Sequence, residues 1–398
     1  MTLTTTLSTA PTPSPEEIIA RVEPVLRAYA PTAEAERRLA PEAITALIDA
    51  GVFRTWVPRA YGGLELDPIP ALQMFEELSR IDSAAGWVAG NSAGIISVGH
   101  AFPDEASAEI AADPRTVMAG SSTPAGAAVP VDGGYCVTGR WPFGSGCTYA
   151  NWLACFCLVM DGDAPRRQPD GSPAILIAIV PAEEAEILDN WHTLGMRGTG
   201  SFDFQAADVF VPAHRTAVLG PFDHKASGYS GPLYRFGLWL NITLLPATAL
   251  GIARAALDDL LTLAAAKTPS YTQAVLADQP VVRDRVGRAR ALIDAGRAAL
   301  YAAVDDAWRF VQAGGRITGD ACIPLGLAVS FAMEAAVEAV DLVHAVAGTT
   351  AIRAEAPFEQ HFRDVHTISQ HAMASSARFA SLGAMLLGRR SDWALYYV

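Results

Sequence analysis

The sequence predicts a mostly helical α+β protein in which a small β-domain lies between two helical regions. Three observations support this: helical apolar spacing before residue 115, strand-length apolar runs between 116 and 220, and long helical patterns after about 235. With 398 residues, 51% of them hydrophobic, the chain can fill more than one core. The expected divisions are a flexible N-terminus at 1–14, a helical domain at 15–115, a β-domain at 116–220 and a helical bundle at 221–398.

The N-terminal region begins with residues that have neither a basic stretch nor an apolar core, so no signal peptide is predicted. Ser14 and Pro15 are typical of a helix start. In ALQMFEELSRID, Leu72, Phe75 and Leu78 recur at three-residue steps, as on an amphipathic helix. Residues 84–99 are mostly Gly, Ala and Ser, which favours a buried helix packed closely on its neighbours.

The central region carries strand signals in succession. Asp132-Gly133-Gly134 separates AAVPV from YCVTGRW and indicates a β-hairpin. LACFCLVM and AILIAIVP are apolar runs of strand length, and FDFQAADVFVP alternates polar and apolar residues. Strand alternation places Cys155 and Cys157 on one face.

After this region, long helical patterns cover 243–266, 281–313, 323–347 and 364–389. Gly314-Gly315 and the 348–358 stretch separate them. The most apolar run, 238–253, is interrupted by Asn241 and Pro246, so no membrane-spanning segment is predicted.

Charge and cysteine usage exclude several partners. The formal net charge is −13, which repels nucleic-acid phosphates and anionic membranes, so neither is an expected partner. Five cysteines without paired spacing argue against a disulfide framework and predict a cytoplasmic protein. The chain has no Cys-x-x-Cys pair, so a zinc site is not expected.

Three generic motifs fail their structural requirements. Gly90-Asn91-Ser92-Ala93-Gly94 matches a hydrolase nucleophile elbow, but no β-branched strand precedes it. The glycines of 195–200 precede a strand rather than a helix, which argues against a phosphate loop. His361, His366 and His371 turn about 140° per step on a helix, so they do not converge on one metal.

The segment LGMRGTGSFDFQAADVFVPAHR (194–215) closely resembles the central segment of acyl-CoA dehydrogenases. Tyr61-Gly62-Gly63, EELSRIDSAAGW (76–87), GRWPFGSGCTYANWL (139–153) and PFEQHFRDVHT (357–367) match the same family in the same order. The resemblance covers nearly the whole chain after residue 15. It implies a flavoprotein with an N-terminal helical domain, a middle β-barrel-like domain and a C-terminal four-helix bundle.

The departures from that family concern its catalytic base. Arg363-Asp364 is followed by VHTISQHAMAS, which contains no acid, whereas the dehydrogenases carry a glutamate there. The helix at 235–257, where some relatives place it, has none either. An Arg-x-x-Phe-Gly segment that helps to hold FAD is replaced by KTPSYTQAVLADQPVVRDRV. Dehydrogenation needs a carboxylate to take the α-proton, so this activity is disfavoured.

The strings W-P-F-x-S-G, R-D-x-H-T and S-Q-H are instead similar to the oxygenase branch of this fold, which includes two-component phenol and steroid-ring hydroxylases. The resemblance implies a homotetramer that uses O2 and reduced FMN or FAD from a separate NAD(P)H:flavin reductase. Phenolic or polycyclic aromatic hydroxylation is the first expectation, and amine or sulfur oxidation is the second. A dehydrogenase with an unplaced base and a non-catalytic scaffold remain as alternatives.

The resemblance also assigns catalytic candidates. Reduced flavin and oxygen give a C4a-hydroperoxide, which decays unless its N5 proton is held and water is excluded. Ser145 is the matched hydroxyl near N5, and Trp141 and Phe143 are candidates to wall the flavin ring. His371 stands almost where the dehydrogenase glutamate would be, so its imidazole is expected either to deprotonate a phenol or to hydrogen-bond the distal peroxide oxygen. His100 is a second candidate. A loop serine, core aromatics and an ordinary helix histidine are the alternative interpretations.

The remaining candidates would contact the flavin's periphery or the substrate. Residues 222–236 are a candidate wall of the substrate pocket. Arg197 and Arg283 are expected to anchor the cofactor's phosphate, with surface ion pairs as the alternative. Ser121 and Ser122, at the start of the β-domain, are expected to bind flavin or substrate, with hairpin surface as the alternative. The other expected cofactor contacts are Gly146 beside Ser145, Thr199, and Gly348 and Thr349 against the flavin of a neighbouring subunit.

Overall fold

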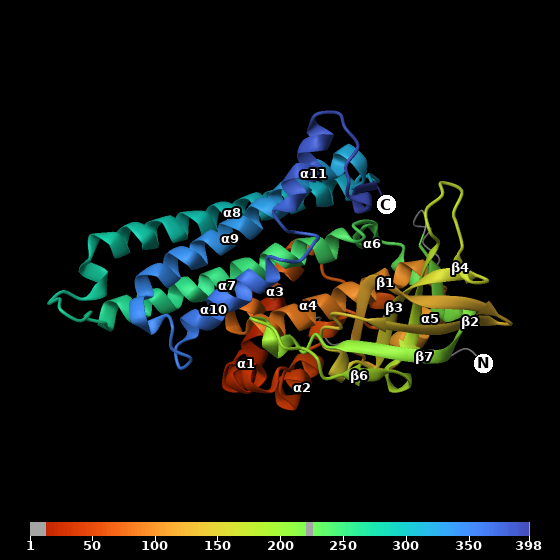
Figure 1. The fold of residues 1–398 in the computed structure, drawn as a ribbon, viewed down its shortest axis with the longest axis horizontal. Helices are drawn as coiled ribbons and strands as arrows, with labels where there is room; N and C mark the ends of the chain where they lie inside the picture. Colours follow the sequence, from red (N-terminus) through yellow and green to blue (C-terminus); the bar gives the residue numbers. More distant parts are fainter. Residues whose placement is uncertain (1–12, 220–225, 398) are drawn as a thin grey trace.

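A computed structural model describes residues 13–219 and 226–397 (Figure 1). The first helix begins as predicted: the Ser14 hydroxyl accepts the Glu17 amide, and the Glu17 carboxylate accepts the Ser14 amide. The predicted flexible segment 1–14 lies mostly outside the described residues. The N-terminal helices are α1 (Pro15–Glu36), α2 (Pro41–Asp49), α3 (Pro68–Ile81), α4 (Ser83–Ser97) and α5 (Asp104–Ala111).

The strands form one sheet in the order β6-β7-β2-β1-β3-β5-β8, with β4 paired to β3. The predicted hairpin is confirmed, because Val131 pairs with Gly134 across a two-residue turn. Cys155 and Cys157 are both buried in the core of the sheet, also as predicted. The strands are β1 (Met118–Val131), β2 (Gly134–Trp141), β3 (Trp152–Asp161), β4 (Ala164–Pro165), β5 (Ile175–Pro181), β6 (Glu186–Leu188), β7 (Asp203–Pro212) and β8 (Thr216–Val218).

The C-terminal helices confirm three of the four long patterns and correct the fourth. The continuous helix expected at 364–389 is wrong, because the chain leaves the helix after Ile368 and re-enters at Ala377. The Ser369 hydroxyl donates to the His366 carbonyl and so competes with helical hydrogen bonding. The helices are α6 (Pro232–Arg235), α7 (Trp239–Ala266), α8 (Pro280–Gln312), α9 (Ile323–Ala347), α10 (Pro357–Ile368) and α11 (Ala377–Leu386).

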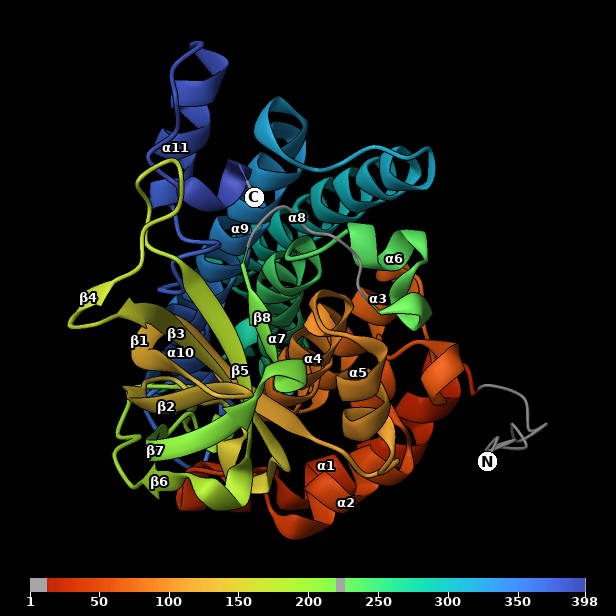
Figure 2. The ribbon, with the colours of Figure 1, turned by 90° about the vertical axis from the view of Figure 1, so that its right-hand side faces the viewer.

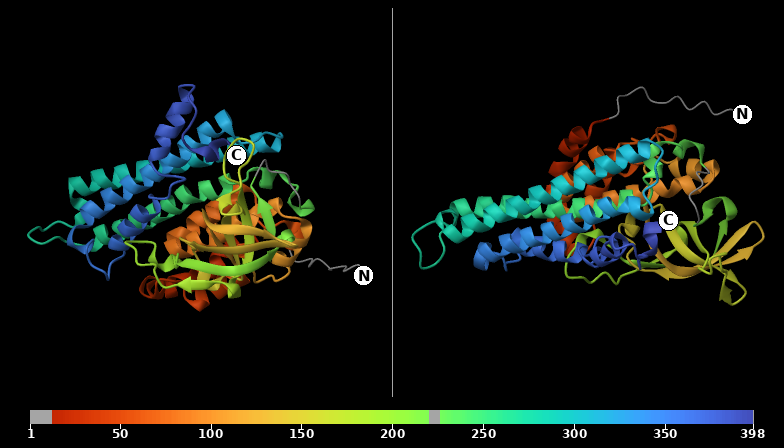
Figure 3. Two further views of the ribbon diagram at one scale, coloured as in Figure 1. Left: turned by 45° about the vertical axis from the view of Figure 1, so that its right-hand side comes forward. Right: turned by 90° about the horizontal axis from the view of Figure 1, so that it is seen from above.

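The long helices α7, α8 and α9 run side by side, and the sheet lies at one end of this bundle (Figures 1 and 3). Helix α4 packs on both α7 and β1, so it joins the two layers, and Figure 2 shows it beside the sheet. Its small residues permit this: a Cβ on Gly90 would lie 2.5 Å from the Leu244 side chain of α7. Close packing of this helix is therefore confirmed.

Two segments are long and apolar enough to cross a membrane by length and composition. The prediction that the chain has no such segment was therefore wrong. Proline and one amide do not lower the hydropathy of α7 enough to exclude it. In the fold, however, 89% of the apolar window of α7 is buried, as in the core helix of a globular protein. The window on 319–350, which contains α9, is 56% buried.

Candidate flavin site

Trp87, in the first half of α4, joins two of the predicted catalytic residues. Its indole Nε1 donates to Ser145 Oγ at 3.0 Å. Its ring also meets the His371 ring edge-on, with 6.0 Å between the centroids. The structure thus brings Ser145 of the β-domain and His371 of the bundle into contact with one half-buried indole.

Ser145 lies in the turn after β2 and is 6% exposed. The following residue, Gly146, has φ +74°, and a Cβ there would lie 2.9 Å from Val88. The Gly146 amide donates to the Thr199 carbonyl at 3.0 Å, which fixes the turn against residues 196–201. Ser145 is therefore held by a backbone conformation that favours glycine next to it.

The segment 196–201 supplies further hydroxyls. Ser201 Oγ lies 2.7 Å from Ser145 Oγ and 2.6 Å from Thr199 Oγ1, and Thr199 Oγ1 donates to the Met196 carbonyl at 2.7 Å. Both side chains are buried. Thr199, predicted as a cofactor contact, is thus the second neighbour of Ser145 along a hydroxyl chain.

Asp364, buried at the C-terminal half of α10, ties this segment to α4. One carboxylate oxygen accepts the Met196 amide, and the other accepts the Ser83 hydroxyl at 2.6 Å. Burial raises the pKa of Asp364. One side chain therefore sets the relative positions of the hydroxyl chain, the start of α4 and the helix that precedes His371.

His371 lies in the turn between α10 and α11. The Met373 amide approaches its Nδ1 at 3.3 Å, so Nδ1 is the acceptor and Nε2 carries the proton. Burial lowers the pKa of His371 to about 4, so the ring is neutral near pH 7. In this tautomer the ring offers an N–H donor, which fits a hydrogen-bonding role better than the predicted alternative of a base.

The two aromatic residues before Ser145 have different surroundings. Trp141 is fully buried in the β-core, donates from Nε1 to the Phe156 carbonyl at 2.7 Å and stacks on Phe204. It has no exposed surface to offer a flavin, so its expected role as a ring wall is corrected to that of a core residue. Phe143 is 65% exposed and contacts Trp191 edge-on.

His100 and the serines of β1 belong to other elements than Ser145 and His371. His100 is buried on the turn after α4, with Nδ1 3.0 Å from the Ser97 carbonyl. The ten residues from Trp87 to Ser97 correspond to roughly 15 Å of helix, so His100 follows the end of α4 that lies away from Trp87. Ser121 is buried and Ser122 exposed, at a register shift in β1.

The predicted phosphate ligands are paired within the chain. Arg197 lies 3.5 Å from Glu34, and the largely exposed Arg283 binds Asp278 at 2.8 Å and the Ala277 carbonyl. The turn with Gly348 and Thr349 follows α9, where Lys267 donates to the Ala347 carbonyl. Figure 1 shows the α7–α8 and α9–α10 turns toward the end of the bundle away from the sheet.

The rejected motifs have structural roles. Ser92 lies within α4 and accepts the Met118 amide at 3.0 Å. His361 pairs with Asp259 and His366 with Asp341, so the three histidines have separate partners. Within 13–219 and 226–397, no group of three His, Cys, Asp or Glu could hold a metal. Part of the 222–236 stretch lies outside the described residues; Tyr229 and Tyr234 from the rest pack in the core.

The donor set at Trp87 fits the ring of a flavin. Ser145 supplies a neutral oxygen, His371 a neutral N–H, and Trp87 an aromatic edge, with no charge among them. Sequence reasoning missed Trp87 and Ser201. The signal for Trp87 was available, because it is the single aromatic side chain in the small-residue run 83–97; nothing in the sequence singles out Ser201.

Comparison with known proteins identifies the family of the fold. Residues 16–107 match the acyl-CoA dehydrogenase N-terminal domain, and residues 243–376 match the acyl-CoA dehydrogenase C-terminal domain. The fold is therefore that of the acyl-CoA dehydrogenases, and the altered site separates the chain from the dehydrogenases themselves.

The relatives define the branch. Indole-3-acetate monooxygenase of Pseudomonas putida is 33% identical over 89% of each chain. The oxygenase subunit HsaA of Mycobacterium tuberculosis is 31% identical over 88% of this chain and 89% of its own. Its crystal structure covers 96% of this chain and 100% of its own at 28% identity, with a TM-score of 0.86. XiaF from Streptomyces, solved with FADH2 and glycerol, covers 95% of this chain and 97% of its own at 25% identity and TM-score 0.86. The chain belongs to the flavin-dependent monooxygenases of the acyl-CoA dehydrogenase fold.

Proposed function

We propose that this chain is the oxygenase component of a two-component system that hydroxylates a phenolic or polycyclic aromatic substrate. A separate NAD(P)H:flavin reductase supplies reduced FMN or FAD, and O2 is the co-substrate. The relatives named as an oxygenase subunit and as an indole-3-acetate monooxygenase support this proposal.

The observation that carries the proposal is the convergence of Ser145 and His371 on Trp87. A dehydrogenase needs a carboxylate where His371 lies, and residues 365–376 contain no acid. A neutral imidazole and a hydroxyl suit oxygen transfer instead, because neither brings a charge into the site.

When bound, the reduced flavin supplies the two electrons that activate O2. The chain's own residues then have three tasks. Ser145 holds a proton of the flavin in place through its hydroxyl oxygen. Trp87 covers the space between Ser145 and His371 and excludes water. His371 donates from Nε2 to the oxygen of a phenol or to the oxygen that is transferred.

We also infer a homotetramer in the cytoplasm. The window on 319–350 is apolar but only 56% buried, and large apolar side chains on α8, α9 and α11 are exposed, which a second copy would cover. Phe331 of α9 is 40% exposed, and Leu386 and Leu387 at the end of α11 are 64% and 80% exposed. Such packing would bring Gly348 and Thr349 to a neighbour's flavin. The five cysteines are free thiols, which suits a reducing compartment.

The test is turnover with a supplied reductase or chemically reduced FMN and FAD, over a panel of phenols, fused aromatics, amines and sulfides. Product and H2O2 are both measured. We expect product from the aromatic group, and Ser145→Ala lowers the fraction of flavin oxidation that yields product by about tenfold while H2O2 rises, as loss of one hydrogen bond predicts. Light scattering of the same preparation tests the tetramer.

Ser172→Ala is the matched control, because Ser172 is a half-buried serine in a β-domain loop whose hydroxyl donates to the nearby Asp170. In this variant the fraction of flavin oxidation that yields product should equal that of the natural chain. Product from amines or sulfides alone would move the proposal to N- or S-oxidation, and failure to bind either reduced flavin would refute it.

A further inference from the structure

Four side chains form a continuous hydrogen-bonded chain through the site. The indole of Trp87 donates to Ser145 Oγ at 3.0 Å, and Ser145 Oγ lies 2.7 Å from Ser201 Oγ. Ser201 Oγ lies 2.6 Å from Thr199 Oγ1, which donates to the Met196 carbonyl at 2.7 Å. Ser145, Ser201 and Thr199 are 6%, 4% and 1% exposed, so water has little access to the chain.

The two ends of this chain fix the direction of every hydrogen bond in it. An indole N–H can only donate and a carbonyl can only accept, while each hydroxyl has one proton and two lone pairs. Thr199 uses its proton on Met196, so it must accept from Ser201. Ser201 has then used its own proton and must accept from Ser145. Ser145 therefore has no proton left to donate; one of its lone pairs takes the indole N–H and the other remains.

We propose that Ser201 and Thr199 are positioning residues that hold Ser145 as a hydrogen-bond acceptor and thereby make this enzyme bind reduced flavin in preference to oxidised flavin. The inference rests on the proposed function, in which Ser145 faces the flavin N5. Reduced flavin carries a hydrogen on N5, which the remaining lone pair of Ser145 accepts. Oxidised flavin has no hydrogen on N5, so the lone pair of N5 would face the remaining lone pair of Ser145 and no hydrogen bond would form.

Such selection suits an enzyme that receives its flavin from another protein. The reduced form is retained until O2 and substrate arrive, and the oxidised product leaves. The selectivity comes from the direction in which the Ser145 hydroxyl donates its proton. The hydrogen-bonded network around it is neutral, since none of its four side chains is charged. The selectivity is therefore expected to depend little on salt.

Breaking the hydrogen-bonded chain at Ser201 weakens the preference for reduced flavin. In Ser201→Ala, Ser145 loses its acceptor and its proton is free to turn toward a bare N5. We expect oxidised flavin to bind about tenfold more tightly relative to reduced flavin, the effect of roughly one hydrogen bond. For a two-electron couple this tenfold change lowers the potential of the bound flavin by about 30 mV. Thr199→Val acts in the same direction, because it returns the Ser201 proton to Ser145.

The experiment measures, on the full chain under anaerobic conditions, the Kd of oxidised FMN and FAD and of the same flavins after photoreduction. The natural chain and Ser201→Thr, which keeps the hydroxyl, should give the same high ratio of oxidised to reduced Kd. Ser201→Ala and Thr199→Val should lower that ratio about tenfold, with circular dichroism to show that each folds.

If the ratio of oxidised to reduced Kd is unchanged in both variants, including the case in which both Kd values rise equally, the inference is overturned. The proposed function would remain intact. If the natural chain binds neither form, the proposed function fails and the inference fails with it. The two failures are thus distinguishable.

Discussion

Two buried polar networks in this molecule differ in how completely their groups are paired. At the site, the hydroxyl chain from Trp87 to Met196 is neutral and leaves one lone pair on Ser145. In the bundle, Glu76 of α3 is 1% exposed and is saturated by partners. Its carboxylate lies 2.8 Å from Arg254 and 2.8 Å from Arg297 and accepts the Tyr301 hydroxyl.

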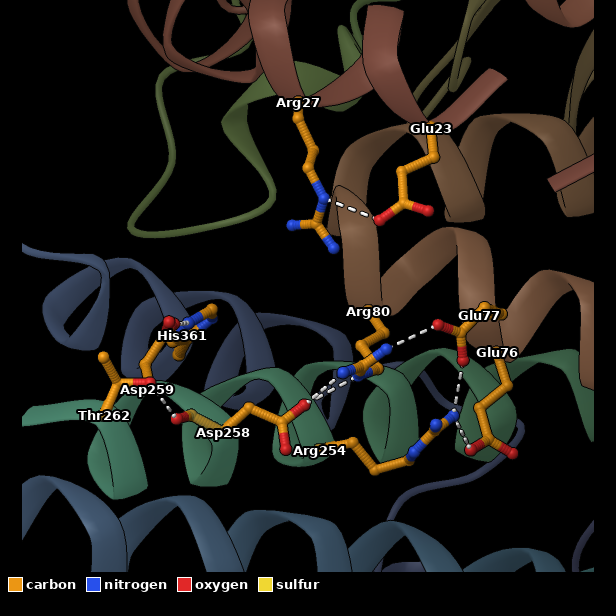
Figure 4. Close-up of polar contacts among 10 residues, drawn as sticks. All are labelled: Glu23, Arg27, Glu76, Glu77, Arg80, Arg254, Asp258, Asp259, Thr262 and His361. Carbon is orange, nitrogen blue, oxygen red and sulfur yellow. Dashed lines mark hydrogen bonds and ion pairs between the residues drawn. The ribbon is translucent and has the colours of Figure 1, made fainter. Parts of the chain in front are cut away.

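Figure 4 shows how the charged network spreads between α3 and α7. Arg254 reaches both Glu76 and Glu77, and Arg80 bridges Glu77 to Asp258 at 2.6 Å. Every charge here has an opposite partner. The cluster therefore fixes how the helices pack.

The difference teaches where function resides in this fold. A buried charge that lost a partner would be costly, so the charged network must be complete. A neutral hydroxyl tolerates one empty lone pair at small cost, so it can wait for a ligand. Stability and cofactor binding should consequently respond to different substitutions.

The largest effect is expected from Glu76→Gln. Removing the charge leaves Arg254 and Arg297 partly buried without their main partner, which should lower the free energy of unfolding by about 3 kcal/mol. Flavin Kd should stay within about twofold, because the partners of Glu76 lie on α7 and α8 and none of them is a site residue. Urea unfolding at fixed protein concentration measures the first, and titration with reduced flavin the second.

Glu77→Gln is the matched control for that change. Its side chain is 27% exposed and Arg254 would keep Glu76, so the loss should be under about 1 kcal/mol. Equal losses of unfolding free energy in Glu76→Gln and Glu77→Gln would show that the deeper burial of Glu76 does not make its charge more important for stability.

A smaller effect on stability, but a direct one on the site, is expected from Asp364→Ala. The Met196 amide and the Ser83 hydroxyl both lose their acceptor, at about 2 kcal/mol in all. Because the 196–201 segment is then untethered, reduced flavin should also bind about tenfold more weakly. Ser83→Ala removes only one of the two bonds and should cost about 1 kcal/mol with unchanged flavin binding.

Much of the fold could be predicted from periodicity and turn residues, and the site only in part. Val137 and Trp141 share a strand face at even spacing, so alternation alone would have assigned Trp141 to the core that the structure shows. The break at 369–376 escaped prediction because the apolar spacing continues across it. The contact between Trp87 and Ser145 joins residues 58 positions apart, and only tertiary structure reveals it.

The last and smallest effect concerns pH. Burial lowers the pKa of His371 to about 4, whereas an unfolded chain has a value near 6.5. Between these values the unfolded chain binds a proton that the folded chain does not, so acidification destabilises the fold. The contribution is complete above about pH 6.5 and is lost as pH falls toward 4. Asp82 acts oppositely, because burial raises its pKa to about 6 and protonation favours the folded state.

Comparing the natural chain with His371→Gln isolates the histidine, since Asp82 is common to both. Their difference in unfolding free energy should change by about 1 kcal/mol between pH 6.5 and 4, after allowance for partial exposure. Urea unfolding at half-unit pH steps measures it. A difference that stays constant over this range would mean that His371 titrates as it does in water. The ring would then be partly charged near neutral pH, and its assignment as a neutral Nε2 donor would not hold.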